Sequence, residues 1–145
     1  MKRSDLMIET IREKCSEVIL ELVALITKDI SIDDIVFVKY RIKSSKSIIN
    51  KATIKKINYD EVYDVIGINL VFYTEYQVRI YLEQIKEIEE VKIKKVLDYI
   101  SNPCGKNNYR AIHIQLEYQG CPCEIQLKTE EMDREAELSY SKYKG

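Results

Sequence analysis

Two consecutive segments, 109–118 and 121–129, alternate apolar and polar residues with a period of two, and only a Gln-Gly dipeptide separates them. Such alternation is typical of strands with one buried and one exposed face. A two-residue connection containing glycine usually joins antiparallel neighbours. The sequence therefore predicts an antiparallel hairpin, which excludes an all-helical fold.

The rest of the chain adds helices and further strands. Apolar residues from Ile11 to Ile26 recur at helical spacing, whereas other stretches are rich in β-branched and aromatic residues. Together they predict an α+β fold, a mixed five-stranded β-sheet flanked by helices. The expected elements are helix 4–28, strand 34–42, a helix from Ser44 or Ser45 to about 57, strand 65–73, a helix carrying Val78, Tyr81, Ile85 and Ile88, strand 90–100, loop 101–108, the hairpin, and a last helix capped by Thr129.

Length and composition indicate one folded domain. The chain has 145 residues and 46% hydrophobic residues, enough for a single core and too many for a disordered chain. No apolar run approaches the length of a membrane span, and the first residues lack a secretory core. We therefore expect a cytoplasmic protein with no membrane partner.

Charge is balanced overall but segregated along the chain. There are 23 Lys+Arg against 24 Asp+Glu, yet residues 39–56 contain seven basic residues and no acidic one. The overall balance argues against stable nucleic-acid binding, whereas a local basic patch suits a compact polyanion such as a nucleotide.

Four cysteines raise the question of a metal–thiolate site. The only close pair, Cys121 and Cys123, has the spacing C-x-C, whereas zinc sites usually pair ligands as C-x₂₋₄-C. Cys15 lies on the apolar stripe of the first helix, where a small hydrophobic residue is the ordinary interpretation. The spacing therefore argues against a metal–thiolate site.

The segment "RIKSSKSIINK" has the features of a polyphosphate site. Arg41 and Lys43 share one side of a strand, and a helix begins at the serines that follow. Ser47 and Lys51 are four residues apart on that helix and lie on one face. The alternative is a solvated basic surface.

Two carboxylates stand near the starts of apolar strands, Asp64 in "DVIGINLVF" and Glu124 in "CPCEIQLKT". Two such groups at neighbouring strand ends are how phosphoryl-transfer sites hold Mg²⁺. Gly67 leaves a position without a side chain in the first of these strands. Glycine within a strand often marks a place where a ligand or another backbone approaches closely. Taken singly, each carboxylate could equally be a turn or surface residue.

A third group follows the polar loop, where Tyr109, Ala111 and His113 share one strand face. An aromatic ring beside a small residue predicts a platform on which a base stacks. The alternative is that Tyr109 packs internally and His113 only makes a hydrogen bond.

In this order, the segments "RIKSSKSIINK", "DVIGIN", "DYISNPCGKNNYRAIH" and "EIQLKT" resemble the RelA/SpoT-type nucleotide pyrophosphokinase domain of the alarmone synthetases. The resemblance covers residues 41–129 and implies a nucleotidyltransferase-like core. It implies an Mg²⁺-dependent transfer of the β,γ-pyrophosphate of ATP to the ribose 3′-hydroxyl of GDP or GTP. By position, it assigns catalysis and Mg²⁺ to Asp64 and Glu124, ATP binding to Arg41, Lys43, Ser47 and Lys51, and acceptor binding to Asn107, Tyr109, His113, Gln126 and Lys128.

The resemblance also implies the organisation of the chain. Residues 1–145 form a single synthetase domain, with an N-terminal helix over 1–30, a catalytic core over 34–129 and a C-terminal helix over 130–145 that is expected to be truncated. Small members of the family assemble through terminal helices, which implies a homo-oligomer.

Some positions depart from the family pattern. Asn69 replaces an arginine that packs against adenine in the family, and Arg79 is the expected substitute. These departures leave two other functions open: a catalytically inactive nucleotide-binding or regulatory module, and an enzyme that uses an adenine nucleotide or a tRNA end as acceptor. The further departures are Cys104 with Lys106 nearby, Asn108, Lys128 and Tyr140.

Overall fold

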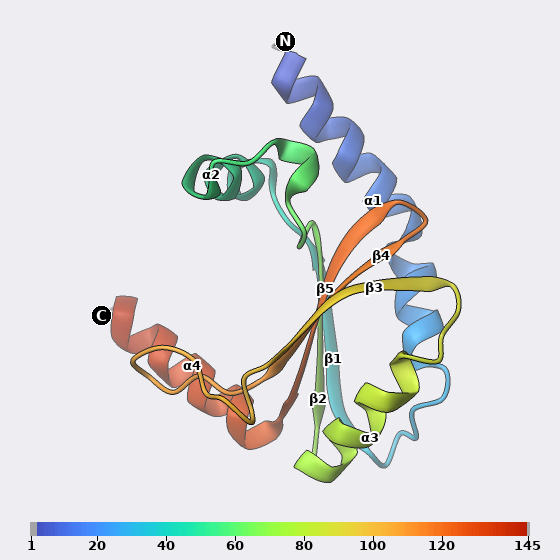
Figure 1. The fold of residues 1–145 in the computed structure, drawn as a ribbon, viewed down its shortest axis with the longest axis vertical. Coiled ribbons are helices and arrows are strands. Elements are labelled where there is room, and N and C mark those ends of the chain that lie inside the picture. Colours follow the sequence, from blue (N-terminus) through green and yellow to red (C-terminus); the bar gives the residue numbers. More distant parts are fainter. Residues whose placement is uncertain (1–2, 145) are drawn as a thin grey trace.

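The predicted order of helices and strands is confirmed (Figure 1). The structure, a computed structural model, describes residues 3–144, of which residues 4 and 140–144 are described by their backbone alone. Tyr140 lies on the last helix, and its side chain falls outside the described part. The elements are α1 (Arg3–Thr27), β1 (Ile35–Ile42), α2 (Ser45–Lys55), a 3₁₀ turn η1 (Tyr59–Glu61), β2 (Ile66–Phe72), α3 (Glu75–Ile85), β3 (Val91–Asp98), β4 (Ile112–Tyr118), β5 (Cys121–Thr129) and α4 (Glu130–Lys144).

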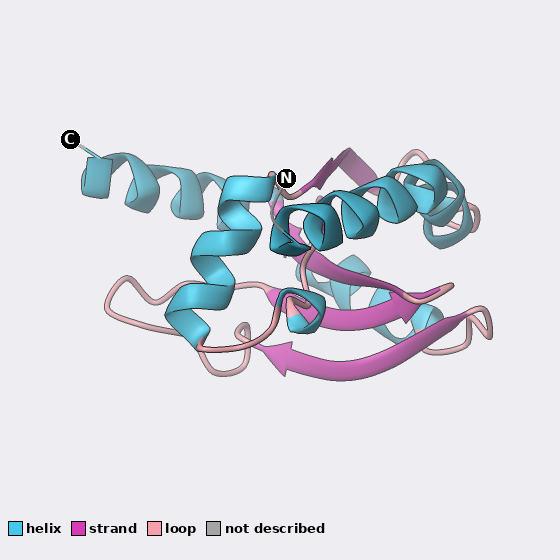
Figure 2. Cartoon of the chain, turned by 90° about the horizontal axis from the view of Figure 1, so that it is seen from above, coloured by secondary structure: helices cyan, strands magenta, loops and turns pink. Residues whose placement is uncertain are grey.

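The five strands form one mixed sheet in the order β1-β2-β5-β4-β3. β2 and β5 are parallel, and the other neighbours are antiparallel. The predicted hairpin joins β4 to β5, with Tyr118 opposite Cys121. Gln119 and Gly120 have φ of 49° and 77°, the positive values that a tight two-residue hairpin turn requires. Figure 2 shows the twisted sheet from above.

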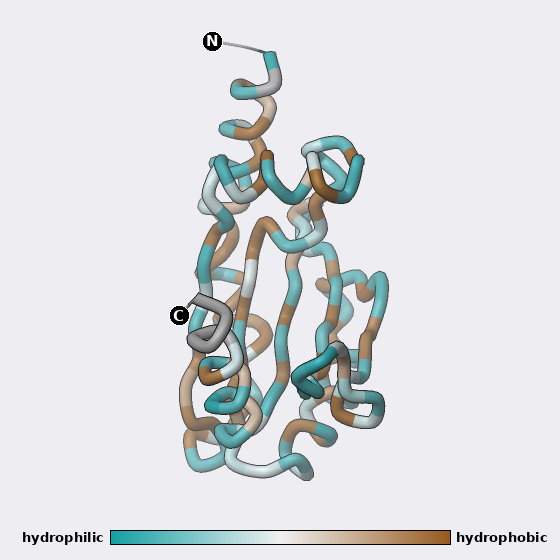
Figure 3. The backbone as a smooth tube through the Cα atoms, turned by 90° about the vertical axis from the view of Figure 1, so that its left-hand side faces the viewer, coloured by the Kyte–Doolittle hydropathy of each residue, from teal (hydrophilic) through white to brown (hydrophobic). Residues whose placement is uncertain are grey.

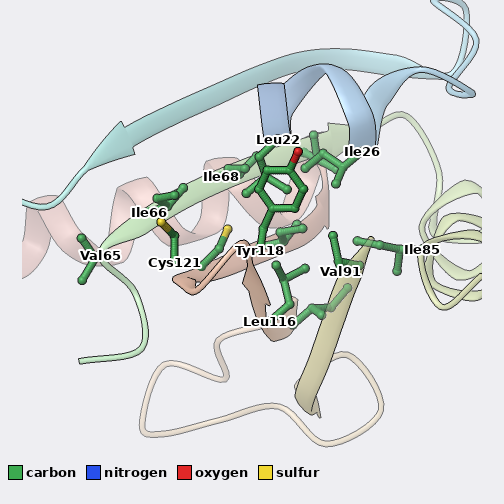
Figure 4. Packing of buried hydrophobic residues seen from close by; sticks show 14 of the residues in the cluster. Leu22, Ile26, Val65, Ile66, Ile68, Ile85, Val91, Leu116, Tyr118 and Cys121 are labelled. Carbon is green, nitrogen blue, oxygen red and sulfur yellow. The ribbon is translucent and has the colours of Figure 1, made fainter. Parts of the chain in front are cut away.

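One face of the sheet is apolar and covered by α1 and α3. Leu22 of α1 and Ile85 of α3 converge there on Ile68 of β2 and Leu116 of β4, all of them buried (Figure 4). Full burial of each such side chain contributes about 1.5–3 kcal/mol. The predicted helical stripe of α1 is thus the part of that helix that closes the core.

The opposite face of the same strands, here called the polar face, carries charged and amide side chains. The hydropathy along the strands alternates accordingly (Figure 3). In Figure 1, α2 and α4 lie on this side, one toward each end of the sheet. The residues of the polar face that matter below are Lys39 and Arg41 of β1, Gly67 and Asn69 of β2, His113 of β4, and Glu124, Gln126 and Lys128 of β5.

Predicted helix caps fix the two helices on the polar side. The hydroxyl of Ser44 accepts a hydrogen bond from the backbone N–H of Ser47 and so begins α2. Thr129 begins α4 in the same way, by accepting from the N–H of Met132. Such caps contribute about 0.5–2 kcal/mol and set where each helix starts.

The longest helix, α1, is amphipathic, with acidic and basic residues outside its buried stripe. Across residues 3–144, none of the helices combines the length and the apolar character needed to cross a membrane.

Candidate active site

Asp64 is held between two lysines. Lys43 Nζ lies 3.2 Å and Lys51 Nζ 2.9 Å from the same carboxylate oxygen, Asp64 Oδ2. The basic segment and the first carboxylate, which were predicted separately, therefore form one cluster. Burial alone would raise the pKa of Asp64, but the ion pairs with Lys51 and Lys43 hold it below its usual value.

The end of β1, the helix α2 and the cap of α2 fix this cluster in place. Lys43 directly follows β1, and its backbone N–H donates to the carbonyl of Val65 at 2.7 Å. Lys51 is in the second turn of α2, and its ammonium lies 3.9 Å from the centre of the Tyr63 ring. The cap at Ser44 sets the rotation of α2 and hence the direction of Lys51.

A cavity of about 360 Å³ opens on the polar face and contains both predicted metal ligands in its walls. Asp64 precedes β2 and Glu124 lies on β5, the parallel neighbour of β2, with Gly67 opposite Glu124. The expectation that the two carboxylates come together is thus met by the fold. The lining residues are Lys39, Tyr40, Arg41, Asp64, Gly67, Ile68, Asn69, Glu124 and Gln126.

The bare position at Gly67 is covered by a side chain. A methyl group placed there would meet the Arg41 side chain at 3.7 Å, an ordinary van der Waals contact. Arg41 therefore lies over Gly67 in the wall of the cavity, and it stands two residues before Lys43 in the chain.

Glu124 is the start of a hydrogen-bonded network that reaches β4. Gln126 Nε2 donates to Glu124 Oε1 at 3.2 Å, and His113 Nδ1 lies 3.6 Å from Glu124 Oε2. Burial alone would raise the pKa of Glu124, but His113 and Gln126 bring it below its usual value. Glu124 is therefore an ionised carboxylate at neutral pH.

Tyr109 closes the far end of this network. Its hydroxyl lies 2.7 Å from His113 Nε2 and donates to Gln126 Oε1 at 3.4 Å. Its ring is edge-on to His113, with 5.4 Å between ring centres. Burial raises the pKa of Tyr109, so the phenol stays neutral. Internal packing, the alternative considered for Tyr109, thus occurs in the structure, and its stacking role stays a prediction.

Two predicted acceptor residues lie beside a second cavity, of about 250 Å³, between the 101–108 loop and α4. Asn107 and Tyr109 line it. Lys128, on the polar face, is almost fully buried, 3.7 Å from Asp133 of α4 and 5.8 Å from the centre of the Tyr109 ring. Burial lowers the pKa of Lys128.

Two expectations need adjustment. Arg79 does not line the cavity, because its guanidinium binds Asp98 at 2.5 Å and Ser101 at 3.0 Å. The expected substitution for the adenine-side arginine is therefore wrong. Ser47 hydrogen-bonds with Ser44 at the start of α2, so its predicted contact with ATP stays untested.

Sequence reasoning missed three residues that line the cavity, Lys39, Tyr40 and Ile68. Lys39 stands two residues before Arg41 on the same strand and pairs in register with Asn69. The period of two that selected Arg41 and Lys43 could have extended to Lys39. Tyr40 and Ile68 have no comparable signal, because they pair with each other between the polar-face positions of β1 and β2, where the alternation predicts the apolar face.

The carboxylates suit a magnesium ion. Asp64 Oδ1 is buried and is the one buried side-chain polar atom, among those described, without a hydrogen-bond partner. Within residues 3–144 no group of three or more potential metal ligands gathers. Mg²⁺ commonly uses one or two carboxylates and completes its shell with water and substrate phosphates, so this pair fits that ion.

The cysteines lie away from the polar face. Cys15 of α1 and both Cys121 and Cys123 of β5 are buried in the core, and Cys104 is exposed in the loop. Burial raises the pKa of Cys15 to about 12, so this thiol remains protonated and packs as a small apolar group.

The sequence has recognisable relatives. The family described as "Region found in RelA / SpoT proteins" matches residues 40–145. A probable chloroplastic GTP diphosphokinase (RSH3) of Oryza sativa subsp. japonica is 34% identical over 102 residues, which are 70% of this chain and 14% of that protein. The chain thus corresponds to a small part of a much longer relative.

Solved structures share the fold. Small alarmone synthetase 2 from Bacillus subtilis superposes with a TM-score of 0.79 at 23% identity, over 98% of this chain and 80% of that one. Small alarmone synthetase 1 from Bacillus subtilis, bound to its product pppGpp, gives a TM-score of 0.77 at 22% identity, over 94% of this chain and 78% of that one. The predicted α+β architecture is therefore that of the small alarmone synthetases.

Proposed function

This chain belongs to the family of RelA and SpoT proteins, and from that premise we propose that it transfers the β,γ-pyrophosphate of ATP to the ribose 3′-hydroxyl of GDP or GTP. In this reaction the 3′-oxygen bonds to the β-phosphorus, the bond from that phosphorus to the α,β-bridging oxygen breaks, and AMP leaves. The protein must then neutralise the triphosphate, align the hydroxyl and accept its proton.

The donor nucleotide belongs at the end of the cavity nearest α2. Lys43 and Lys51 bring two ammonium groups together on Asp64, which lines the cavity, and Arg41 lies over Gly67 in the same wall. The proposed triphosphate would extend from the lysines along β1 and β2 toward Lys39 and Asn69, which line the other end. Ser47, on the first turn of α2, completes the proposed ATP site.

Asp64 and Glu124 would hold Mg²⁺ between the two ends of the cavity. The unpartnered Oδ1 of Asp64 supports this assignment, because a carboxylate oxygen is a ligand that Mg²⁺ prefers. When bound, Mg²⁺ would neutralise negative charge on the transferred phosphates. Glu124 has an ionised carboxylate in the same cavity and is the proposed acceptor of the 3′-hydroxyl proton.

The acceptor nucleotide belongs on the side of Glu124 that faces β4. His113 and Gln126 contact Glu124 directly, and Tyr109 is the proposed stacking surface for the guanine base. Asn107 and Lys128 complete the proposed acceptor site around the second cavity. A related protein of this fold is bound to pppGpp, which supports a guanine acceptor here.

The observation that carries the proposal is that Asp64 and Glu124 line one cavity while two lysines converge on Asp64. A module that only binds nucleotides has no need of a second carboxylate facing the first. We therefore favour the enzyme over the inactive binding module, and over an offshoot that uses adenine nucleotides or tRNA.

The test incubates the protein with Mg²⁺ and γ-labelled ATP, together with GDP, GTP, GMP, ADP or bulk tRNA in separate reactions. Chromatography then shows which acceptor takes the label. Transfer to GDP or GTP is expected, and Glu124→Gln should remove it. Glu117→Gln is the matched control, because Glu117 lies on neighbouring β4 and pairs with Lys94 outside the cavity.

Other outcomes redirect the proposal. Label on ADP or tRNA would identify a different acceptor. Binding of ATP without any transfer would support the inactive module. A cytoplasmic location, a homo-oligomeric state, the absence of stable nucleic-acid partners and the single-domain organisation over 1–145 stay predictions.

A further inference from the structure

The cluster around Asp64 is tightly enclosed. The side chains of Lys43, Lys51 and Asp64 expose only 11%, 19% and 10% of their surface. Water therefore screens their charges poorly, and each charge depends on its partners in the cluster. The two ammonium groups and one carboxylate leave a single net positive charge.

The two oxygens of Asp64 are used unequally. Oδ2 contacts both lysines, whereas Oδ1 is buried without a hydrogen-bond partner. Buried polar atoms are normally paired, and one without a partner is destabilising. The cluster is thus complete on its lysine side and incomplete on the Oδ1 side.

This arrangement opposes a polyphosphate that carries no metal. Lys43 and Lys51 are the ammonium groups that phosphate oxygens would need, and Asp64 Oδ2 already holds both of them. A metal-free triphosphate would also lie beside the carboxylate, with like charges in contact. A divalent cation removes both obstacles, because it binds the carboxylate and lets the lysines turn to the phosphates.

We propose that Asp64 is the internal counter-ion of the empty site and makes it selective for metal-loaded over metal-free triphosphate. The inference rests on the proposed donor site. In the empty site Asp64 holds Lys43 and Lys51. In the loaded site a divalent cation takes Asp64, and the lysines pass to the phosphate oxygens, so every charge stays paired.

The first test measures calorimetric binding of inorganic tripolyphosphate with EDTA and then with Mg²⁺. Asp64→Asn should bind metal-free tripolyphosphate at least about tenfold more tightly than the wild type, because the lysines are freed and a like charge is gone. The advantage that Mg²⁺ gives the wild type should largely disappear. The proposal is overturned if Asp64→Asn binds the metal-free probe no more tightly than the wild type.

Asp60→Asn is the matched control for charge. Asp60 is exposed, lies four residues before Asp64 and does not line the cavity. It should leave tripolyphosphate binding unchanged in both conditions. A gain in affinity equal to that of Asp64→Asn would mean that net charge alone is responsible, which would also overturn the proposal.

The second test measures binding of the metal instead of the polyphosphate. It tests the same proposal without the Asp64→Asn variant, in case that variant fails to fold. Mn²⁺ alone serves as the probe, followed by electron paramagnetic resonance. Lys51→Gln removes one competitor for Asp64 and should bind Mn²⁺ several-fold more tightly than the wild type. Lys55→Gln, exposed one turn further along α2, should match the wild type. Equal Mn²⁺ affinity in Lys51→Gln and the wild type would contradict the proposed exchange, in which Asp64 passes from the lysines to the metal.

Neither test contains an acceptor nucleotide. Tight metal-free binding by Asp64→Asn without any pyrophosphate transfer by the wild type would leave the exchange standing and reject the proposed function. Transfer by the wild type without the expected changes in binding would reject the exchange alone.

Discussion

The two faces of the sheet come from the same strands but are held by different interactions. On the α1 and α3 side, Ile125 and Leu127 of β5 are fully buried among apolar side chains. On the polar face, Glu124 and Gln126 of the same strand contact each other and line a cavity. Apolar side chains pack without directional contacts, so one can often replace another of similar size. Each polar contact instead depends on particular donor and acceptor atoms. Substitutions on the two faces should therefore affect different properties.

The largest effect is expected on the apolar face. Ile125→Ala should lower the free energy of unfolding by about 2–5 kcal/mol, because it removes buried methyl groups and leaves a cavity. Urea unfolding followed by circular dichroism measures the loss. A change below about 1 kcal/mol would mean that the core beside β5 is loosely packed.

The neighbouring residue should show the opposite profile. Glu124→Gln keeps the size of the side chain and should lower the rate of pyrophosphate transfer by at least about 100-fold, the usual scale for loss of a general base. The free energy of unfolding should change by less than about 1 kcal/mol, measured as for Ile125→Ala. A variant as unstable as Ile125→Ala would break the distinction between the faces.

Two substitutions of Tyr109 distinguish the role of its ring from that of its hydroxyl. Tyr109→Phe removes the group that contacts His113 Nε2 at 2.7 Å and should cost about 1–3 kcal/mol of stability, since that nitrogen loses its partner. If the ring stacks on the acceptor base, Tyr109→Phe keeps the KM for GDP, and Tyr109→Ala raises it. Equal KM values in the two variants would remove the stacking role.

Asp98, at the end of β3, is polar but does not line the cavity, so it should affect stability alone. Burial would raise its pKa, but hydrogen bonds from Arg79, Ser101 and Ile100 lower it to about 2. The fold thus favours the carboxylate: Asp98 stabilises it above the unfolded pKa, near 4, and this contribution is lost as the pH falls from about 4 to about 2.

Unfolding free energies measured across that pH range test the assignment. The Asp98→Asn variant should show a flatter dependence on pH than the wild type, with unchanged transfer activity at neutral pH. Parallel curves for the two proteins would show that Asp98 contributes nothing through its charge.

Gly67 is expected to give the smallest change. An added methyl group meets only the Arg41 side chain at 3.7 Å, so Gly67→Ala should alter stability by less than about 1 kcal/mol. If the donor nucleotide displaces Arg41 and approaches the bare backbone, the variant should bind ATP several-fold more weakly. Unchanged ATP affinity in a titration would show that the glycine is not needed for close approach.

The fold could be predicted because each element has a local signal. The period of two in β4 and β5, the helical stripe of α1 and the caps at Ser44 and Thr129 all act within a few residues. The order of the sheet has no such signal, since placing β5 beside β2 depends on packing across the whole domain.

The sequence could select several of the residues that the structure brings together, but not how they pair. Asp64, Lys43 and Lys51 were selected by separate patterns, and nothing in the sequence indicates that both lysines bind one carboxylate oxygen. Arg79 illustrates the same limit. Its charge suggested a substitute for Asn69, but Asp98 and Ser101 come close only after β3 folds back beside α3, and they bind its guanidinium.

The central position of β5 in the sheet also determines when the sheet can form during synthesis on the ribosome. β5 is the last of the five strands of the sheet to be synthesised, yet it joins β2 to β4. Until residue 129 has left the exit tunnel, the edges of β2 and β4 that β5 later covers stay unpaired, and such edges can recruit other nascent chains. We expect ribosome-bound chains that stop before Cys121 to be cut readily by protease. Protection of the chain from the protease should appear in one step once β5 has left the exit tunnel. Chaperones that shield strand edges would act in that interval.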